Sequence, residues 1–326
     1  MKNILKTVAI LGVFMLYLPS CEEVEIPEPV DRFINLDDNT TTAINANIPR
    51  LDINVNGNSV TASISVTDQN GLPLENFRIG NYQIREVVQF SDTTVVNARL
   101  IEPSEVEELP LGLSAVVDYS GSLSALDIEN SENALRQFVS IKDDEDVFSI
   151  IKFSTGVNLI QDFTNDTDLL NNAINSSYPS GFTAFYDACQ LALQNSKLND
   201  ISNNFFPVIV TFTDGGDTGS STFFSSLINN SIACGIPIYN IGIGGADQVT
   251  LNTLSSSTGG RALFAPTSAE LGDLYAQISK QLSTLYTVEW NYSSLPGTTV
   301  TVVVDVEYTA AGGTFTNRAL GTYTVP

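Results

Sequence analysis

The sequence predicts a doubly wound α/β domain with a mostly parallel sheet, inserted into an antiparallel β-sandwich that is built from both flanks. Two observations carry this prediction. Between residues 110 and 283, short apolar runs alternate with segments whose apolar residues recur at helical spacing, which is typical of a sheet covered by helices on both faces. Residues 51–102 and 284–326 instead are rich in Val, Thr, Ile and Tyr with period-two alternation, which indicates half-buried antiparallel strands.

The elements expected in the central domain follow from these patterns in order. The strands are expected at residues 113–117, 147–153, 157–163, 206–212, 237–243 and 261–265, the third of them turning back beside the second. Helices are expected around residues 134–139, at 183–196, at 221–233 and at about 268–283. In this last segment and just beyond it, helical spacing relates Leu271, Leu274, Ile278, Leu282 and Leu285. Right-handed crossovers between the parallel strands then give the doubly wound arrangement.

Each flank alone is too small to form a stable sheet, so we expect the two to close one sandwich around the inserted domain. One expected strand face carries Tyr286, Val288, Trp290 and Tyr292, and another carries Val300, Val302, Val304, Val306 and Tyr308. Asn70-Gly71 and Gly312-Gly313 supply turns. The expected boundaries are 50–109 for the N-terminal part of the sandwich, 110–283 for the central domain and 284–326 for the C-terminal part.

The first 49 residues are expected to lie outside the fold. In residues 1–20, two lysines precede an apolar run that is too short to span a bilayer, which is typical of a signal peptide. The Leu-Pro-Ser-Cys that ends at Cys21 resembles the lipobox of bacterial lipoproteins and implies a lipid-bearing Cys21, the alternative being an ordinary signal peptide with an incidental cysteine. Residues 21–49 are acidic, contain prolines and predict a flexible tether. Acidic residues directly after Cys21 resemble the surface-export signal of Bacteroidetes lipoproteins. They favour the outer membrane surface over the periplasm or the inner membrane.

The chain is strongly acidic and contains no histidine. The chain contains 14 Lys and Arg residues and 37 Asp and Glu residues, which gives a net charge of −23. Removal of the predicted signal peptide would remove two lysines and change the net charge to −25. Such a field repels nucleic acid and anionic lipid headgroups. Without histidine, neither a Cys/His zinc site nor a catalytic His base is available. Cys189 and Cys234 are expected to be small buried residues, with a disulfide between them as the alternative.

Five oxygen-bearing side chains from three distant segments form the candidate functional site. They are Asp118, Ser120 and Ser122 in V-V-D-Y-S-G-S, Thr183 in S-G-F-T-A-F-Y-D-A, and Asp214 in V-T-F-T-D-G-G. Each segment follows a predicted buried strand or precedes a predicted helix, so all three are expected at the carboxyl edge of the sheet where strand order reverses. Carboxylate and hydroxyl oxygens suit Mg²⁺, with Mn²⁺ and Ca²⁺ as alternatives.

These segments resemble the von Willebrand factor type A domain family. In that family an Asp-x-Ser-x-Ser loop, a distant Thr and a distant Asp hold a divalent cation at a metal-ion-dependent adhesion site, and all five positions match here. The resemblance implies that the two aspartates act largely through waters. It also implies that a remaining metal position accepts a Glu or Asp of a protein partner.

Two further carboxylates near these segments could support the ligands from behind. Asp187 lies one helical turn after Thr183 and recurs in the family's Thr-x-x-Tyr-Asp-Ala helix start. For Asp187 we favour a first-turn acid that interacts with the helix dipole. Asp217 and Ser220 follow Asp214 in a Gly-rich loop, and we expect them to cap the next helix rather than contact metal.

Three classes of function remain open from the sequence. The leading one is a cell-envelope lipoprotein, not an enzyme, that binds an acidic residue of a partner through the cation for adhesion or complex assembly. The alternative is a metal-assisted hydrolase or phosphotransferase that uses Asp118 as nucleophile, although the motif segments hold no Lys or Arg to clamp phosphate. A permanent structural assembly through the same site is the third.

Overall fold

The computed structural model describes residues 32–88, 93–101, 109–203, 205–264 and 268–326. The predicted signal peptide, Cys21 and the first part of the predicted tether lie outside these residues. Within them, no helix is both long enough and apolar enough to cross a membrane.

The central sheet has six strands in the order β12-β11-β10-β7-β8-β9. They are β7 (Leu111–Asp118), β8 (Val147–Phe153), β9 (Val157–Thr164), β10 (Phe206–Thr213), β11 (Ile238–Gly242) and β12 (Ala262–Phe264). All neighbours pair in parallel except β8 and β9, which are antiparallel as expected from the sequence. The chain builds outward from β7 to β8 and β9, then returns to β10 on the other side of β7. Strand order therefore reverses between β7 and β10.

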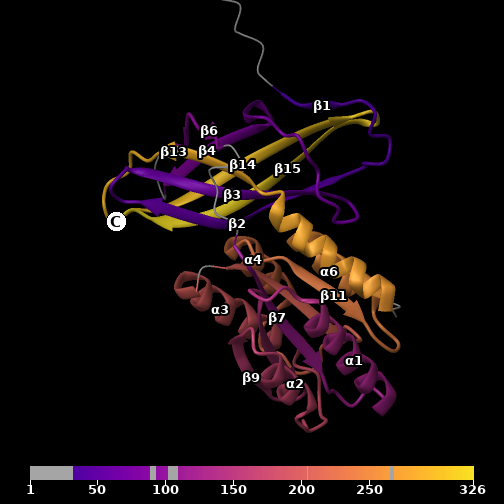
Figure 1. Ribbon diagram of the computed structural model, residues 1–326. Coiled ribbons are helices and arrows are strands. Elements are labelled where there is room, and N and C mark those ends of the chain that lie inside the picture. Colours follow the sequence, from indigo (N-terminus) through magenta and orange to yellow (C-terminus); the bar gives the residue numbers. More distant parts are fainter. Residues whose placement is uncertain (1–31, 89–92, 102–108, 204, 265–267) are drawn as a thin grey trace, which may run out of the picture. The chain divides into compact units, whose positions relative to one another are not determined.

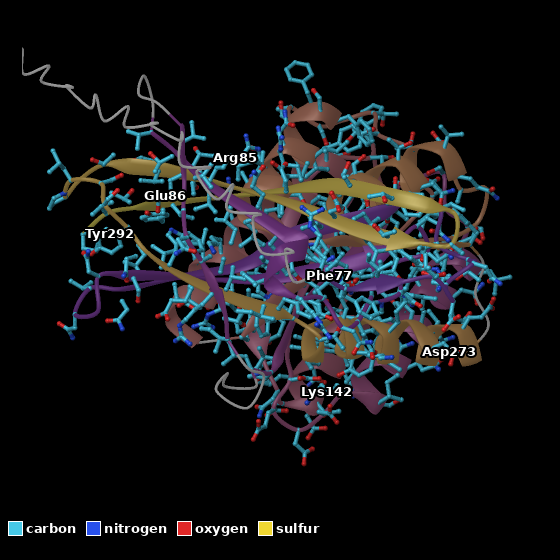
Figure 2. All side chains as sticks on the ribbon, turned by 90° about the horizontal axis from the view of Figure 1, so that it is seen from above. Phe77, Arg85, Glu86, Lys142, Asp273 and Tyr292 are labelled. Atoms are coloured by element: carbon cyan, nitrogen blue, oxygen red, sulfur yellow. The ribbon has the colours of Figure 1, made fainter. Side chains whose placement is uncertain are left out.

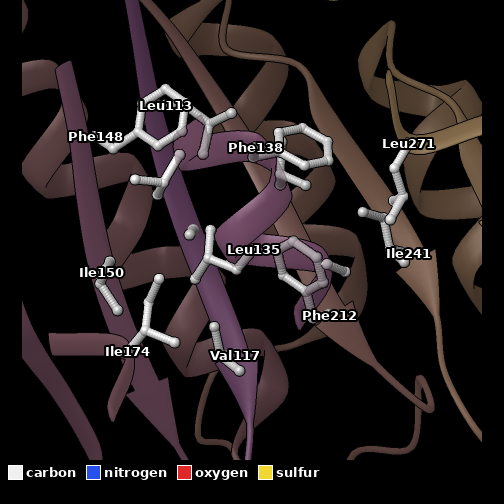
Figure 3. Close-up of a cluster of buried hydrophobic side chains, with 14 of the residues drawn as sticks. Leu113, Val117, Leu135, Phe138, Phe148, Ile150, Ile174, Phe212, Ile241 and Leu271 are labelled. Carbon is white, nitrogen blue, oxygen red and sulfur yellow. The ribbon is translucent and has the colours of Figure 1, made fainter. Parts of the chain in front are cut away.

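Helices cover both faces of this sheet (Figure 1). One face packs against α1 (Ala125–Ile141), α2 (Thr167–Asn175) and α6 (Ser268–Ser283), and the other against α3 (Phe185–Asn203), α4 (Phe224–Cys234) and α5 (Gln248–Thr258). Figure 3 shows the first of these cores, where Leu135 and Phe138 of α1 pack over Leu113 and Phe212. The predicted doubly wound α/β fold is confirmed. The helices α2 and α5 were not predicted, and α3 runs seven residues beyond its predicted end at Ser196.

The flanks form two facing sheets with one shared core. The first contains β1 (Ile34–Asn35), β4 (Tyr82–Val88), β5 (Thr93–Val95), β14 (Thr299–Ala310) and β15 (Gly313–Thr324), and the second contains β2 (Ile44–Asn54), β3 (Ser59–Asp68), β6 (Arg99–Leu100) and β13 (Tyr286–Asn291). A 3₁₀ turn (Ile79–Asn81) precedes β4. Every pair is antiparallel except β1 with β14. The predicted sandwich of both flanks is confirmed.

The sandwich core contains the residues that the period-two patterns predicted. Val300, Val302, Val304, Val306 and Tyr308 are all at most 2 % exposed. The ring of Phe77, labelled in Figure 2, lies 5.8, 5.3 and 5.5 Å from the ring centroids of Tyr82, Tyr286 and Tyr308, respectively. An aromatic cluster thus joins residues that are more than two hundred positions apart in the sequence.

The predicted extent of the flexible tether is wrong. Residues 44–49, which we assigned to the tether, belong to strand β2, which pairs with β3. Ile44 and Ile48 are both 3 % exposed and lie in the sandwich core. Asparagine and alanine between these two isoleucines obscure the apolar pattern in the sequence, because only tertiary packing gives this segment a buried face.

The sandwich and the α/β region are in polar contact along α6 and in close backbone contact at the end of α4. The amide nitrogen of Gln281 donates to Ser65 Oγ at 2.8 Å, and Tyr239 of β11 donates to the oxygen of the same amide. At the end of α4, Gly235 has a left-handed φ of 70°. A Cβ at this glycine would stand 1.7 Å from the carbonyl oxygen of Ile48. The close approach of β2 therefore requires glycine here.

The two described cysteines are free thiols, as favoured from the sequence. Cys189 is fully buried on α3, and burial raises its pKa well above the ordinary thiol range. Cys234 is half-buried at the end of α4.

Candidate metal centre

The predicted ligands Asp118 and Asp214 end two neighbouring parallel strands. Asp118 is the last residue of β7, and Asp214 follows Thr213, the last residue of β10. These strands pair in register, with Val117 opposite Phe212. Both aspartates therefore lie at the carboxyl edge of the sheet, at the point where strand order reverses.

Backbone hydrogen bonds bring the loop of Thr183 to the same edge. The carbonyl of Thr183 accepts from the amides of Thr218 and Gly219, both at 2.9 Å, in the loop that follows Asp214. On the other side, the amide of Gly121 in the Asp-x-Ser-x-Ser loop donates to the carbonyl of Gly181 at 2.9 Å. The loop of Thr183 is thus joined to both other motif segments. Thr183 itself stands two residues before α3 rather than at its first residue.

Asp118 is fully buried, and both of its carboxylate oxygens accept hydrogen bonds. The amide of Ser120 donates to Oδ1 at 2.7 Å, and the hydroxyl of Thr213 donates to Oδ2 at 2.6 Å. Burial raises the pKa of Asp118 to about 6, the hydrogen bonds from Thr213 and Ser120 oppose this rise, and the charge of Asp214 adds to it. A nearby cation would stabilise the ionised form of the buried Asp118 and of the half-buried Asp214.

The three predicted hydroxyl ligands lie at the mouth of the same edge. Ser120 Oγ and Ser122 Oγ are 3.0 Å apart, and Ser120 is buried whereas Ser122 is exposed. Thr183 is buried, and Asp214 is half-buried with its Oδ1 accepting from the amide of Gly216 at 3.2 Å. Among the described residues, Thr183 and Asp214 reach this edge through their loops and not through a side-chain hydrogen bond to the other three.

The donor set fits a hard divalent cation. Two carboxylates balance the charge of such an ion, and three hydroxyls add neutral oxygen ligands. No group of three or more His, Cys, Asp or Glu side chains that could hold a metal occurs in the described part of the chain. Any metal held at this edge would therefore depend on its serine and threonine hydroxyls.

Asp217 and Ser220 cap a different helix from the one expected. Asp217 accepts from the amide of Tyr186 at 2.9 Å and from that of Ser220 at 3.1 Å. Ser220 Oγ in turn accepts from the amide of Asp187 at 2.9 Å. Both side chains thus cap the first turn of α3. The prediction that they cap the following helix is wrong, since α4 begins after Phe223 without a side-chain cap.

Asp187 also connects α3 to the loop after Asp214 through hydrogen bonds to backbone amides. Its carboxylate accepts from the amides of Ser221 at 2.9 Å and Thr222 at 2.8 Å. Burial alone would raise its pKa, but the hydrogen bonds from Thr222 and Ser221 hold the pKa of Asp187 below the ordinary aspartate value. Asp187 and Asp217 therefore fasten α3 to the loop that carries Asp214.

Thr213 is a contributor that sequence reasoning missed. It is fully buried, donates to Asp118 Oδ2 and accepts from the amide of Gly215 at 3.0 Å. Its side chain thereby connects one predicted carboxylate ligand to the turn after the other. A second threonine, at the end of the mostly apolar strand V-I-V-T-F-T, was the available signal.

Lys152 is a second residue whose role the sequence did not indicate. It is fully buried in β8, and its Nζ donates to the carbonyls of Ile174, at 2.8 Å, and Ser176 at the end of α2. The same nitrogen lies 4.7 Å from the ring centroid of Tyr119, whose hydroxyl donates to Glu132 at 2.8 Å. Burial lowers the pKa of Lys152 to about 8. Tyr119 lies between Asp118 and Ser120 in the sequence, so the contact of Lys152 with the Tyr119 ring helps to hold the first motif loop in place.

The fold and the position of these loops define a doubly wound α/β domain with oxygen-bearing loops gathered at one sheet edge. The family model that matches residues 113–277 is the von Willebrand factor type A domain. The chain belongs to this family. Domains of this kind generally serve as interaction modules rather than enzymes, commonly bind protein partners, and typically hold a divalent metal at a metal-ion-dependent adhesion site.

The chain is also similar to several known proteins and to a solved structure. Inter-alpha-trypsin inhibitor heavy chain H2 of Mesocricetus auratus is 25 % identical over 240 residues, which cover 68 % of this chain and 25 % of the relative. The human protein of the same name is 25 % identical over 242 residues with the same coverage. The chain thus spans about a quarter of the length of these relatives. A von Willebrand factor type A structure from Catenulispora acidiphila is 12 % identical with a TM-score of 0.47, covering 86 % of this chain and 73 % of that one.

Proposed function

We propose that this protein binds a Glu or Asp side chain of a protein partner through a divalent cation, and that it does so as a lipid-anchored protein of the cell envelope. Asp118, Ser120, Ser122, Thr183 and Asp214 would hold the cation, Mg²⁺ being the first choice and Mn²⁺ or Ca²⁺ the alternatives. When bound, the metal would supply an electrophilic position for the partner's carboxylate. The protein's own residues supply the oxygen ligands and keep the loops in place.

The observation that carries this proposal is the joining of three distant segments at one sheet edge. The Thr183 carbonyl accepts two amide hydrogen bonds from the loop after Asp214, and Gly121 bonds the loop before Thr183. Asp187 and Asp217 add side-chain hydrogen bonds between α3 and the same loop. Such cross-linking prearranges the oxygens, so little conformational entropy is lost when a cation binds.

The alternative is a hydrolase or phosphotransferase with Asp118 as nucleophile, and the geometry gives it little support. A nucleophilic carboxylate needs an oxygen that can reach a substrate. Asp118 is fully buried, and each of its oxygens already accepts a short hydrogen bond, from Ser120 and from Thr213. The same buried, hydrogen-bonded environment suits a carboxylate that stabilises a cation without contacting a substrate.

The envelope location rests on the N-terminal sequence alone. Cys21 would carry the lipid, and the acidic residues that follow it favour the outer surface of the outer membrane over the periplasm. The segment between Cys21 and the first strand, β1, would act as the tether. Radiolabelled acyl-chain incorporation that is lost in Cys21→Ser would support this part of the proposal, and incorporation that persists would reject it.

The metal-binding part is tested with Asp214→Ala and a matched carboxylate control, Asp273→Ala, at an exposed position of α6. Loss of a residue that only orients metal ligands costs about 10- to 100-fold in metal affinity, so loss of Asp214 should cost at least that much. Calorimetric titration with Mg²⁺ and Mn²⁺ measures the affinity, and denaturant unfolding checks the fold. Equal affinities in Asp214→Ala and Asp273→Ala would reject the site.

Partner binding is tested by retrieval of proteins from the native envelope on immobilised protein, with and without EDTA. Partners that depend on the metal should be lost with EDTA and with Asp214→Ala, and retained with Asp273→Ala. A partner that survives washing but not EDTA would indicate a lasting assembly rather than transient adhesion. Undiminished retrieval in EDTA would contradict the proposed function.

A further inference from the structure

Large apolar side chains gather in the segments that surround the candidate metal centre. Within residues 111–283, the large hydrophobic residues that are more than 60 % exposed are Leu126, Phe182, Leu198, Phe223 and Val249, as far as the described chain shows. Four of these five belong to the loops or first helical turns at the carboxyl edge of the sheet. Scattered exposed hydrophobics are normal on a protein surface, whereas a group around one site marks an interaction surface.

The topology accounts for the placement of all four. Leu126 is the second residue of α1 and Val249 the second residue of α5, and these helices follow the parallel strands β7 and β11 directly. Phe223 immediately precedes α4, which follows β10. Phe182 precedes Thr183, and a Cβ placed on Gly219, in the loop after Asp214, would stand 3.5 Å from Phe182 Cβ. We call Leu126, Phe182, Phe223 and Val249 the apolar rim.

The N-cap and the first turn of a helix normally favour polar or acidic residues, because the unpaired amides and the helix dipole attract negative charge. Leu126, Phe223 and Val249 occupy such positions with exposures of 64, 76 and 76 %, respectively. They contribute little to the cores of the fold at these exposures. Apolar contact with a partner would bury the area that folding leaves uncovered.

The charge of the same edge restricts that partner further. The segments 118–127, 178–187, 214–223 and 244–249 contain no Lys or Arg. Their acidic residues are Asp118, Asp127, Asp187, Asp214, Asp217 and Asp247. A divalent cation offsets two of these six charges, so the edge remains negative around the site. A partner segment with several acidic residues would be repelled, whereas one with a single carboxylate beside basic residues is complementary.

We infer that the partner segment carries one Glu or Asp flanked by apolar side chains and by Lys or Arg. This inference rests on the proposed metal-dependent function and specifies the ligand of the same site. The carboxylate would meet the cation, the apolar flanks would cover the apolar rim, and the basic residues would face the remaining aspartates. Polyacidic segments are rejected by the field of the edge.

The test uses a phage-displayed library of short peptides with a fixed central Glu and randomised flanking positions. The whole protein is immobilised with Mg²⁺, and bound phage are eluted with EDTA and sequenced. The variants are Phe182→Ser with Phe223→Ser, and Leu198→Ser as a control that removes an equally exposed leucine, 72 % exposed, near the end of α3. Calorimetric titration with Mg²⁺ is done on all three proteins to separate metal binding from peptide binding.

We expect enriched peptides to carry apolar residues and Lys or Arg beside the Glu, and to be depleted of further acids. Since aromatic residues at the centre of an interface commonly account for a tenfold or larger part of its affinity, recovery on the double variant should fall by about tenfold. Recovery on Leu198→Ser and the Mg²⁺ affinity of all three proteins should be unchanged.

Three results overturn the inference. Enriched peptides without apolar or basic flanks contradict it, as does equal recovery on the double variant. Metal-loaded protein that retains no EDTA-elutable peptide overturns it while leaving the metal site intact. A wild-type protein that binds no divalent cation overturns the proposed function itself, and that outcome is recognised in the titration before any selection is made.

Discussion

The hydroxyl of Thr213 offers a direct test of how the sheet supports the candidate metal centre. Thr213 Oγ1 donates to Asp118 Oδ2 at 2.6 Å and accepts from the amide of Gly215 at 3.0 Å, and the side chain is fully buried. Thr213→Val keeps the shape of the side chain but replaces its hydroxyl with a methyl group. The carboxylate then loses a donor, and the Gly215 amide loses its acceptor.

The expected magnitudes follow from the chemistry of the lost contacts. A hydrogen bond to a charged group stabilises a folded protein by about 1.5–3 kcal/mol, and an orienting partner of a metal ligand is worth about 10- to 100-fold in metal affinity. At about 1.4 kcal/mol per tenfold, the second range corresponds to about 1.4–2.8 kcal/mol. The two ranges agree, so Thr213→Val should weaken Mg²⁺ or Mn²⁺ binding by about 10- to 100-fold.

The matched control is Thr211→Val, two residues earlier on the same strand. Thr211 is also fully buried, and its hydroxyl donates to Asn240 Oδ1 at 2.6 Å, away from both predicted carboxylate ligands. Both variants should lower the free energy of unfolding, measured with denaturant in EDTA. Only Thr213→Val should lower the metal affinity measured by calorimetry. Unchanged affinity in Thr213→Val, or an equal loss in Thr211→Val, would refute the reasoning.

Two further predictions concern positions away from the candidate ligands. Gly235 and Gly297 both have a left-handed φ, of 70° and 79°, so replacing either with Ala should cost about 1–2 kcal/mol in unfolding free energy. Gly235→Ala should cost about 1–3 kcal/mol more, because its Cβ would stand 1.7 Å from the Ile48 carbonyl oxygen. A Cβ at Gly297 would meet nothing within 4 Å. Equal costs would contradict the close approach of β2. Lys152→Met should lower the free energy of unfolding by about 2–4 kcal/mol, because it leaves buried carbonyls unpaired. Burial lowers the pKa of Lys152 to about 8 from the ordinary 10.5. The wild-type protein therefore becomes more stable through this group as pH rises between those values. The deficit of Lys152→Met should therefore widen over that interval, and a deficit that narrows would contradict a buried, proton-releasing lysine.

The strands of the central sheet could be predicted because each is an apolar run buried on both faces. The predicted run at 147–153 has the bounds of β8, and the run at 206–212 is one residue shorter than β10. In such strands the sequence pattern and the tertiary environment require the same residues. The edge position of the candidate ligands followed from the same strand ends.

The helix α5 could not be predicted from an apolar face, whereas α2 does bury Leu170, Ala173 and Ile174 on one face of a nine-residue segment and was missed. In α5, Q-V-T-L-N-T-L-S-S-S-T, serine and threonine predominate, and Leu251 and Leu254 are its buried apolar residues. Such a sequence has low intrinsic helix propensity, and packing on the sheet holds it in a helix. Asp166 and Asp247 cap α2 and α5 with their side chains, and these were the local signals available.

The supports behind the candidate ligands were hidden for another reason. Thr213 and Lys152 have polar side chains whose partners are distant in the sequence, such as the Ile174 carbonyl for Lys152. A single sequence shows the polar residue but not the partner that makes its burial tolerable. Their roles therefore follow only from the fold.

The charge of the chain gives the proposed cation a function beyond attaching a ligand. A partner's carboxylate that approached the bare edge would meet six aspartates from segments without Lys or Arg, on a chain with a net charge of −23. Burial is the main cause that raises the pKa of Asp118 to about 6, and the charge of Asp214 adds to this rise. The proposed cation, bound between Asp118 and Asp214, would turn this edge from a surface that repels acids into one that accepts an acid. The Lys and Arg inferred for the partner are attracted by the same field, but charges beyond about 10 Å are largely screened at ordinary ionic strength, so this attraction acts mainly at short range. Recognition must then rest on contacts made at short range, which are the metal position, the apolar rim and the basic residues that we infer for the partner.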